Sequence, residues 1–397
     1  MSFALLALSA CTFALGFAEF VAVSLVPSVA ASLHMNVGSV GMMIGIYAIG
    51  VSIGAPTLSA LLARAPRRGV LAISMLLFAA GNIVTALSPS LPMLLGSRFV
   101  SGLMHGVVIA LASSTASAAA GPEKSGKAIA TVFGGLTVAL MIGVPIGTYA
   151  GGHFRWQDVF VAIAVIGAIS SAALVAFTPV VKVADSGKPN QAASARMQVS
   201  ATVLNTKILH PVLTTALTYA ASFTGFTYIS VLLGKITHLG PTGVTGMFIL
   251  YGVFAAIGNA LGGRCVDRFG SKTATLAVIA GLVIALGGAY LGASSVTAMA
   301  VVMVIWGVAS FGAVPVMQNT VLMVAREHPN ASPEVASGMN IAAFNLGIAV
   351  GSVLGGVASQ HSAAAPMLLG LVPLIFAGLL ALRFDAKAPS AVTMSVQ

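Results

Sequence analysis

The stretch "GGRCVDRFGSK", residues 262–272, concentrates charge in a chain that has very little of it. It holds two arginines, one aspartate and one lysine, whereas charged residues make up only 7% of the 397 residues. Long apolar runs lie on both sides of it. A charged turn between two apolar runs is typical of a loop at the surface of a membrane, so we expect the stretch to join two membrane spans.

The composition of the whole chain predicts an all-α membrane protein. Hydrophobic residues make up 58% of it, and apolar runs long enough to cross a bilayer recur along its length. A soluble domain of this size would carry several times more charge. Twelve transmembrane helices fit the length, and the expected spans are 3–33, 39–62, 69–87, 91–119, 128–152, 157–179, 209–234, 242–264, 273–293, 297–325, 332–358 and 363–383.

One long polar connection lies between the sixth and the seventh expected span. Its sequence is rich in Ser, Ala, Gly and Lys, which is typical of a linker. It divides the chain into two six-helix bundles. The expected organisation is an N-terminal bundle over 1–180, a cytoplasmic linker over 181–207, a C-terminal bundle over 208–384 and a cytoplasmic tail over 385–397.

The net charge of +10 follows the expected topology. If the N-terminus is cytoplasmic, Arg155 and Lys235 are the basic residues on the outer side. The inner side holds fifteen: Arg64, Arg67, Arg68, Lys124, Lys127, Lys182, Lys188, Arg196, Lys207, Arg264, Arg268, Lys272, Arg326, Arg383 and Lys387. Cytoplasmic loops of membrane proteins are enriched in Lys and Arg, so we expect both termini in the cytoplasm. The positive charge is therefore a topology signal and does not indicate nucleic-acid binding.

The opening stretch has a counterpart 204 residues earlier in the chain. At this offset "ARAPRR" (63–68) aligns with "DRFGSK" (267–272), and Tyr47 aligns with Tyr251. The same offset aligns "GVPIGTYAGG" (143–152) with "GIAVGSVLGG" (347–356), including four glycines in each copy. A constant offset over several spans predicts two structurally similar halves in parallel orientation.

These motifs resemble those of the major facilitator superfamily. "GRCVDRFGSK" matches the charged loop of that family between the second and third helices of each half, and "RFVSGLMHG" (98–106) is similar to its fourth-helix motif. "GVPIGTYAGG" resembles the fifth-helix motif of drug:proton antiporters. The chain is most similar to bacterial sugar, arabinose and chloramphenicol efflux permeases. The resemblance implies two six-helix bundles in a bacterial inner membrane, rocking about a central site, with protons as the coupling ion and no other cofactor.

Several residues are candidates for a part in the conformational change. They are Arg64, Arg67, Arg68, Gly143, Pro145, Gly147, Gly263, Asp267, Arg268, Gly270, Lys272 and Glu334. We expect the glycines to allow close helix packing and Pro145 to kink the fifth span. The charged loop is either a latch that forms in one conformer or an anchor for topology alone. The first copy has Ala63 in place of the family's aspartate, so its arginines would need another partner, for which Glu334 is a hypothesis.

Three ionisable residues lie inside expected spans: Glu19 in the first, and Arg98 and His105 in the fourth. A charge at the bilayer centre costs roughly 2.5 to 3.5 kcal/mol on insertion scales, so such residues are functional candidates. The aligned positions for Glu19 and Arg98 in the second half are apolar. We therefore expect proton coupling in the first half, carried by Glu19 with Arg98 and His105. The alternatives are a fixed ion pair with Arg98 and a packing role for His105.

Polar and aromatic residues in the second half are candidates for a substrate cavity. They are Tyr219, Phe223, Phe226, Trp306, Gln318, Asn319, Asn340 and Asn345. A cavity with this lining would suit a neutral or amphiphilic solute. Each of these residues has an alternative role in bonding neighbouring helices to one another.

The function that we expect is proton-coupled export of small organic solutes, such as sugars, drugs or metabolites. Proton-coupled uptake is the alternative, because the same fold supports it. A membrane enzyme is less favoured, since neither a nucleophile with a base nor a metal cluster appears in the sequence. A receptor or channel would not require duplicated halves, and ATP is not expected as the energy source without a Walker motif. The expected partners are a small-molecule substrate and the lipid bilayer, and the protein is expected to be a monomer.

Overall fold

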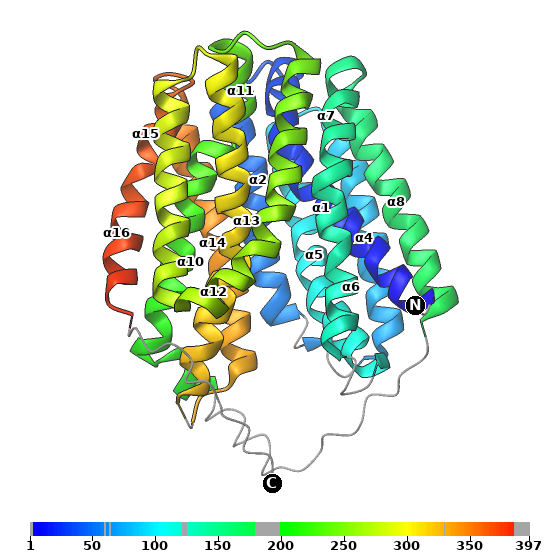
Figure 1. Cartoon of the computed structure of the whole chain (residues 1–397). Coiled ribbons are helices and arrows are strands. Elements are labelled where there is room, and N and C mark those ends of the chain that lie inside the picture. The colour runs from blue at the N-terminus through cyan, green and yellow to red at the C-terminus, as the bar shows by residue number, and fades with distance from the viewer. Residues whose placement is uncertain are drawn as a thin grey trace.

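The computed structural model describes residues 3–58, 61–62, 65–120, 125–178, 199–328 and 330–384. Within this part of the chain, twelve helical segments are long and apolar enough to cross a membrane, which confirms the expected number of spans. The described residues form helices and their connections and contain no β-strand (Figure 1). The expected linker, for the most part, and the tail lie outside the described residues, as does Arg64.

The first six spans include two short π-helical segments. They are formed by α1 (Phe3–Ser32), α2 (Val37–Ile53) with η1 (Gly54–Leu58), α4 (Arg67–Ala86), α5 (Leu91–Ala120), α6 (Ser125–Val138) with η3 (Ala139–Gly143) and α7 (Val144–His153), and α8 (Trp156–Phe177). The proline expected to kink the fifth span, Pro145, lies directly after η3. Since proline cannot donate a backbone hydrogen bond, the change of helical pitch before it is the form that the disturbance takes here.

The last six spans show two breaks that the sequence did not predict, one within the seventh span and one at Gly370 in the twelfth. They are formed by α10 (Thr206–Phe226) with α11 (Ile229–Lys235), α12 (Pro241–Leu291), α13 (Val296–Arg326), α14 (Pro333–Ser359), and α15 (Ala365–Leu369) with α16 (Leu371–Leu382). The seventh span was expected to be continuous over 209–234, but it is interrupted between α10 and α11. Tyr228 at the break donates a hydrogen bond to the backbone oxygen of Ser352 at 2.9 Å, a tertiary contact that the span's own sequence does not reveal.

Helix α12 contains both the eighth and the ninth span, joined at one non-helical residue. The sequence predicted a loop over 262–272, but the backbone stays helical there except at Gly270, whose φ is 76° and ψ is 162°. Arg264 and Arg268 therefore project from helical turns, because a single glycine is enough to reverse the chain direction. Gly270 adopts a backbone conformation that is accessible essentially to glycine alone.

We expect Gly270→Ala to destabilise the protein by roughly 1 to 3 kcal/mol, since a Cβ would strain this conformation. The measurement is the thermal unfolding midpoint of the purified protein in detergent. Gly263→Ala is the matched control, because a Cβ at Gly263 would also meet no atom within 4 Å but its backbone is helical. Equal midpoints for the two variants would contradict the expectation.

The glycines of the repeated motif pack each half together internally. In the first half, a Cβ on Gly143 would lie 3.3 Å from Phe13 and Phe17 of α1, and Gly147 packs against the same helix. In the second half, Gly347 and Gly351 of α14 pack against the backbone of α10. The fifth span therefore contacts the first span as the eleventh contacts the seventh, which agrees with the offset of 204 residues.

The two halves also contact one another at the end of the bundle where α1 ends and α2 begins, which we call the α1–α2 end. A Cβ on Gly38 of α2 would lie 2.5 Å from the backbone oxygen of Gly356 in α14. The Tyr228 hydroxyl, whose shorter bond goes to Ser352, also lies 3.3 Å from the Gly38 oxygen, and Ser230 donates to the Val23 oxygen of α1 at 2.8 Å. These contacts close the α1–α2 end of the interface between the halves.

Candidate functional site

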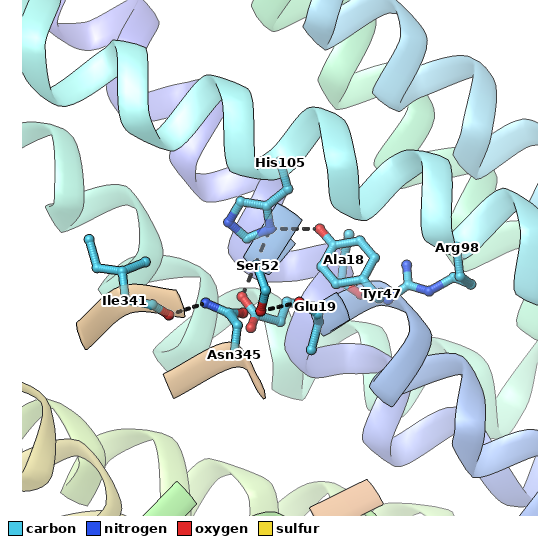
Figure 2. Close-up of polar contacts among 9 residues, drawn as sticks. Ala18, Glu19, Tyr47, Ser52, Arg98, His105, Ile341 and Asn345 are labelled. Atoms are coloured by element: carbon cyan, nitrogen blue, oxygen red, sulfur yellow. Dashed lines mark hydrogen bonds and ion pairs between the residues drawn. The ribbon is translucent and has the colours of Figure 1, made fainter. Parts of the chain in front are cut away.

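The three ionisable residues expected inside the membrane lie in one buried cluster. Glu19 on α1 is 7% exposed, Arg98 on α5 is fully buried, and His105, two turns further along α5, is 3% exposed. Figure 2 shows these side chains together with Tyr47 of α2. The cluster therefore combines one acid, one permanent cation and one titratable imidazole from two helices of the first half, and Tyr47 adds a third helix.

Tyr47 joins the two basic residues of the cluster. Its hydroxyl lies 2.8 Å from Nδ1 of His105, and its ring lies beneath the guanidinium of Arg98, with the carbon Cζ 4.0 Å from the ring centroid. A cation over an aromatic face is stabilised further when both are desolvated. From the sequence, Tyr47 was recognised only as the repeat partner of Tyr251. The presence of a tyrosine inside a span at the same position of both halves could have indicated a polar role for Tyr47.

Glycines bring α2 and α5 close enough for this arrangement. A Cβ on Gly102 would collide with the backbone oxygen of Tyr47. Likewise, a Cβ on Gly106 would lie 2.5 Å from the backbone nitrogen of Ala55, and one on Gly50 would lie 2.5 Å from the oxygen of Phe99. Close backbone approach at small residues is the usual way in which helices associate within a membrane.

Arg98 is held by the backbone and by aromatic rings rather than by Glu19. Its Nη2 donates to the backbone oxygen of Ala18 at 3.1 Å, and its guanidinium also lies 5.6 Å from the ring centroid of Phe160. Two further guanidinium nitrogens, Nε and Nη1, have no hydrogen-bond partner among the described residues. The expected alternative of a fixed Glu19 and Arg98 ion pair within 4.0 Å is not observed in this conformation.

Glu19 instead approaches His105. Its Oε2 lies 4.0 Å from Nδ1 of the imidazole, which is beyond hydrogen-bond length, and its Oε1 has no partner among the described residues. An unsatisfied carboxylate oxygen in a buried site is costly unless it meets a proton or another donor. The geometry therefore leaves Glu19 able to bind and release a proton, with His105 as a neighbouring proton acceptor or donor.

A small apolar cavity lies next to this cluster, and we call it the inner cavity. Its volume is about 110 Å³. It is lined by Ala55, Pro56, Ile109, Ala110, Phe133, Gly338 and Ile341. Of these, Ile109 on α5 and Ile341 on α14 lie one helical turn from His105 and Asn345, toward the end of the bundle that holds the start of α1. The cavity thus borders the ionisable cluster on its apolar side.

A second and larger cavity lies at the opposite, α1–α2 end, and we call it the outer cavity. It has a volume of about 400 Å³ and is lined by residues of α1, α2 and α11 together with the turn that follows α1. His34, Ser230 and Lys235 contribute its polar groups. Ser230, which donates to the Val23 oxygen of α1, forms part of the wall of the outer cavity. The contact between the halves at the α1–α2 end therefore separates the outer cavity from the ionisable cluster.

The aromatic residues expected to line a substrate cavity pack against one another inside the second half. Phe226 stacks on Tyr251 with ring centroids 4.4 Å apart and meets Phe223 and Trp306 edge to face. The indole of Trp306 on α13 donates to Ser222 of α10 at 3.0 Å. Tyr219, also on α10, donates to the backbone oxygen of Ser310 in α13. None of the four expected aromatic residues lines either cavity described above.

Two of the four amides expected at that cavity, Gln318 and Asn340, bond to other side chains. Asn340 accepts from Thr215 at 2.7 Å and donates to Gln318 at 2.7 Å, so these residues tie α10, α13 and α14 together. Asn319 is partly buried beside Gln318. Asn345 differs: it is 4% exposed, its amide donates to the backbone of Ile341, and its Oδ1 has no partner among the described residues.

The expected charged latch is described only in part. Lys272 donates to the backbone oxygen of Leu382 at 2.6 Å, which places a cation at the C-terminal end of α16 within the same half. The guanidinium of Arg268 lies 5.3 Å from the ring centroid of Phe269. Arg67 and Arg68 are half-buried at the start of α4. The side chains of Asp267 and Glu334 lie outside the described residues, so their pairing stays a prediction.

No group of three or more His, Cys, Asp or Glu side chains that could hold a metal ion occurs among the residues that the structure describes.

Known proteins resemble this chain in sequence and in fold. The sequence model of the Major Facilitator Superfamily matches residues 8–334. The inner membrane transport protein YdhP of Escherichia coli (strain K12) is 37% identical over 359 residues, which make up 90% of this chain and 88% of that protein.

Two further comparisons cover nearly the full chain. The chloramphenicol resistance protein of Streptomyces lividans is 31% identical over 363 residues, covering 90% of this chain and 89% of that protein. The crystal structure of the nucleoside transporter NupG has a TM-score of 0.76 at 14% identity, covering 96% of this chain and 98% of that one. At this identity, the likeness to NupG concerns the fold alone.

Proposed function

The chain belongs to the major facilitator superfamily of membrane transporters, and on that premise we propose that it exports small organic solutes in exchange for protons. It is a multi-pass transport protein and not an enzyme. In this proposal protons are the coupling ion, and the solute moves outward. It assigns the coupling to Glu19, with Arg98 and His105 as its charged neighbours.

The observation that carries the proposal is the unsatisfied, buried carboxylate of Glu19. Its Oε1 has no donor in the described part of the chain, and the imidazole of His105 lies 4.0 Å from its Oε2. In a site without water, a buried carboxylate is stabilised when it binds a proton. It releases the proton more readily when water or a cation reaches it, because either one stabilises the charged form. A rocking motion that changes its distance to Arg98, or its access to water, would therefore move a proton on and off.

The two halves would alternate access to this cluster. In the described conformation the halves meet at the α1–α2 end through Gly38, Gly356 and Tyr228, while the inner cavity lies on the other side of the cluster. Opening the α1–α2 end and closing the inner cavity would expose the cluster to the opposite side. We assign residues 1–180 and 208–384 to the two moving bundles, with 181–207 as linker and 385–397 as tail.

For topology, we propose that the α1–α2 end faces outward and that both termini are cytoplasmic in a bacterial inner membrane. The excess of Lys and Arg in the opposite connections supports this orientation. Reporter fusions after Arg68 and after Lys272 are expected to report the cytoplasm. A fusion at either position that reports the external side would contradict the topology.

The partners that we propose are the solute and the lipid bilayer, with the protein acting as a monomer without nucleic acid. We propose a neutral or amphiphilic solute because the inner cavity is lined by apolar side chains. The name of the relative from Streptomyces lividans suggests chloramphenicol as a first probe, and pentose sugars form a second class to test.

Proteoliposomes with an acidic lumen test the proposal. Exchange for protons would drive labelled chloramphenicol, or another solute of the panel, into the vesicles as protons leave, and a pH-sensitive dye would report the proton movement. Accumulation only when the outside is acidic would favour the alternative of proton-coupled uptake. Solute movement without any coupled proton flux would contradict both readings.

A further inference from the structure

A buried amide from the second half faces the same space as the buried acid of the first half. Figure 2 shows the side chains of Glu19 and Asn345 turned toward one another beside Ser52. The packing of α2 on α14 gives the level of Asn345: a Cβ on Gly45 would lie 3.0 Å from the oxygen of Ala349, and Ser52 reaches the oxygen of Ala342 at 3.4 Å. Along α14, Asn345 lies between the two residues that make these contacts, Ala342 and Ala349.

The orientation of the Asn345 amide is determined by its hydrogen bond. Its Nδ2 donates to the backbone oxygen of Ile341 at 3.0 Å, so a flipped amide would set two oxygens against one another. The oxygen Oδ1 therefore points away from that carbonyl. Oδ1 of Asn345 and Oε1 of Glu19 are both buried, and neither has a donor among the described residues. Two such buried acceptors from opposite halves require a donor from outside the protein or a proton on the acid.

The inner cavity adds an apolar compartment to these two acceptors. It begins one helical turn below them, at Pro56 after Ser52, at Ile109 after His105 and at Ile341 before Asn345. Its volume of about 110 Å³ is below the roughly 150 Å³ of an engineered cavity that binds benzene, so it fits a short alkyl group. The site therefore joins a polar head position to an apolar tail position.

We propose that Glu19 and Asn345 together bind the hydrogen-bond donor of the transported solute, an ammonium, amine or hydroxyl group, while the inner cavity takes its apolar part. The two acceptors come from opposite halves, so a bound donor ties the halves together across the site. This inference rests on the proposed function, since it assigns the solute class of the same site.

Equilibrium binding to the purified protein tests the inference separately from transport. The probes are four compounds with the same alkyl chain: butylamine, 1-butanol, butyrate and butyltrimethylammonium. We expect butylamine and 1-butanol to raise the thermal unfolding midpoint in a saturable manner. Butyrate and butyltrimethylammonium should not, because the first repels the carboxylate and the second has no N–H or O–H to donate.

Variants of two asparagines locate the effect. Asn345→Leu is expected to weaken butylamine binding by about tenfold, since one buried acceptor is lost. Asn82→Leu is the matched control, because Asn82 of α4 has the same bond pattern: its Nδ2 donates to Phe78 at 2.8 Å and its buried Oδ1 has no partner in the described part of the chain. No binding of either donor, equal binding of all four probes, or equal effects of the two variants would overturn the inference.

A second variant covers the case in which Asn345→Leu does not fold. Asn345→Asp keeps an acceptor oxygen and adds a negative charge, so it is expected to bind butylamine at least as tightly as the unaltered protein. Weaker butylamine binding by this variant would overturn the inference. Because the readout is ligand binding without a gradient, proton-coupled transport of another solute could still stand after such a result.

Discussion

Glu19→Gln is expected to reduce gradient-driven solute accumulation to the level of liposomes without protein. The amide imitates the protonated acid in size and charge, so the variant should fold and should still exchange labelled for unlabelled solute across the membrane. It cannot release a proton, and the pH gradient is therefore no longer linked to solute movement. The measurement is uphill uptake compared with equilibrium exchange in the same proteoliposomes, for a solute that the screen identifies.

Asp158→Asn is the matched control for this change. Asp158 is an exposed acid in the first turn of α8, so the same loss of a carboxyl group occurs outside the buried cluster. Uphill transport by this variant should equal that of the unaltered protein. If Glu19→Gln still concentrates solute against its gradient, Glu19 is not the coupling residue, and His105, 4.0 Å away, becomes the next candidate.

The sequence predicted the spans well because their signal is local. A run of about 20 apolar residues is visible without knowledge of its neighbours, and the twelve expected spans correspond to the twelve helical segments of the structure. The three intramembrane ionisable residues were also visible, since charge is so rare in this chain. Even Gly270 could be singled out, because the charged loop motif of the family that the chain resembles has a glycine at this position.

Contacts between helices could not be predicted in the same way. The approach of His105 to Glu19 depends on how α5 is rotated and shifted relative to α1, and no single span contains that information. For the same reason, Phe226 and Trp306 were expected at a cavity but pack against one another. The inner cavity is also a property of several helices together, and its apolar lining resembles any other buried surface in the sequence.

Gly38→Val is expected to abolish transport by opening the contact between the halves. A Cβ at this position would lie 2.5 Å from the Gly356 oxygen, and the two nearest atoms are both backbone atoms of Gly356, so a side-chain rotation cannot relieve the clash. The variant should therefore shift the protein toward the form that is open at the α1–α2 end. Gly38 makes no contribution to the ionisable cluster, and the loss would arise from the conformational equilibrium alone.

The accessibility of a single cysteine measures this shift. Ser230→Cys, in a background with Cys11→Ala and Cys265→Ser, places a thiol at a residue that is 4% exposed on the wall of the outer cavity. In this background Gly38→Val should accelerate labelling by a membrane-impermeant maleimide about tenfold or more, which corresponds to about 1.4 kcal/mol in the equilibrium. Gly234→Val lies on the same wall, where a Cβ would meet no atom within 4 Å, and should leave the rate unchanged. Equal rates for both valine variants would mean that the Gly38 contact does not hold the α1–α2 end closed.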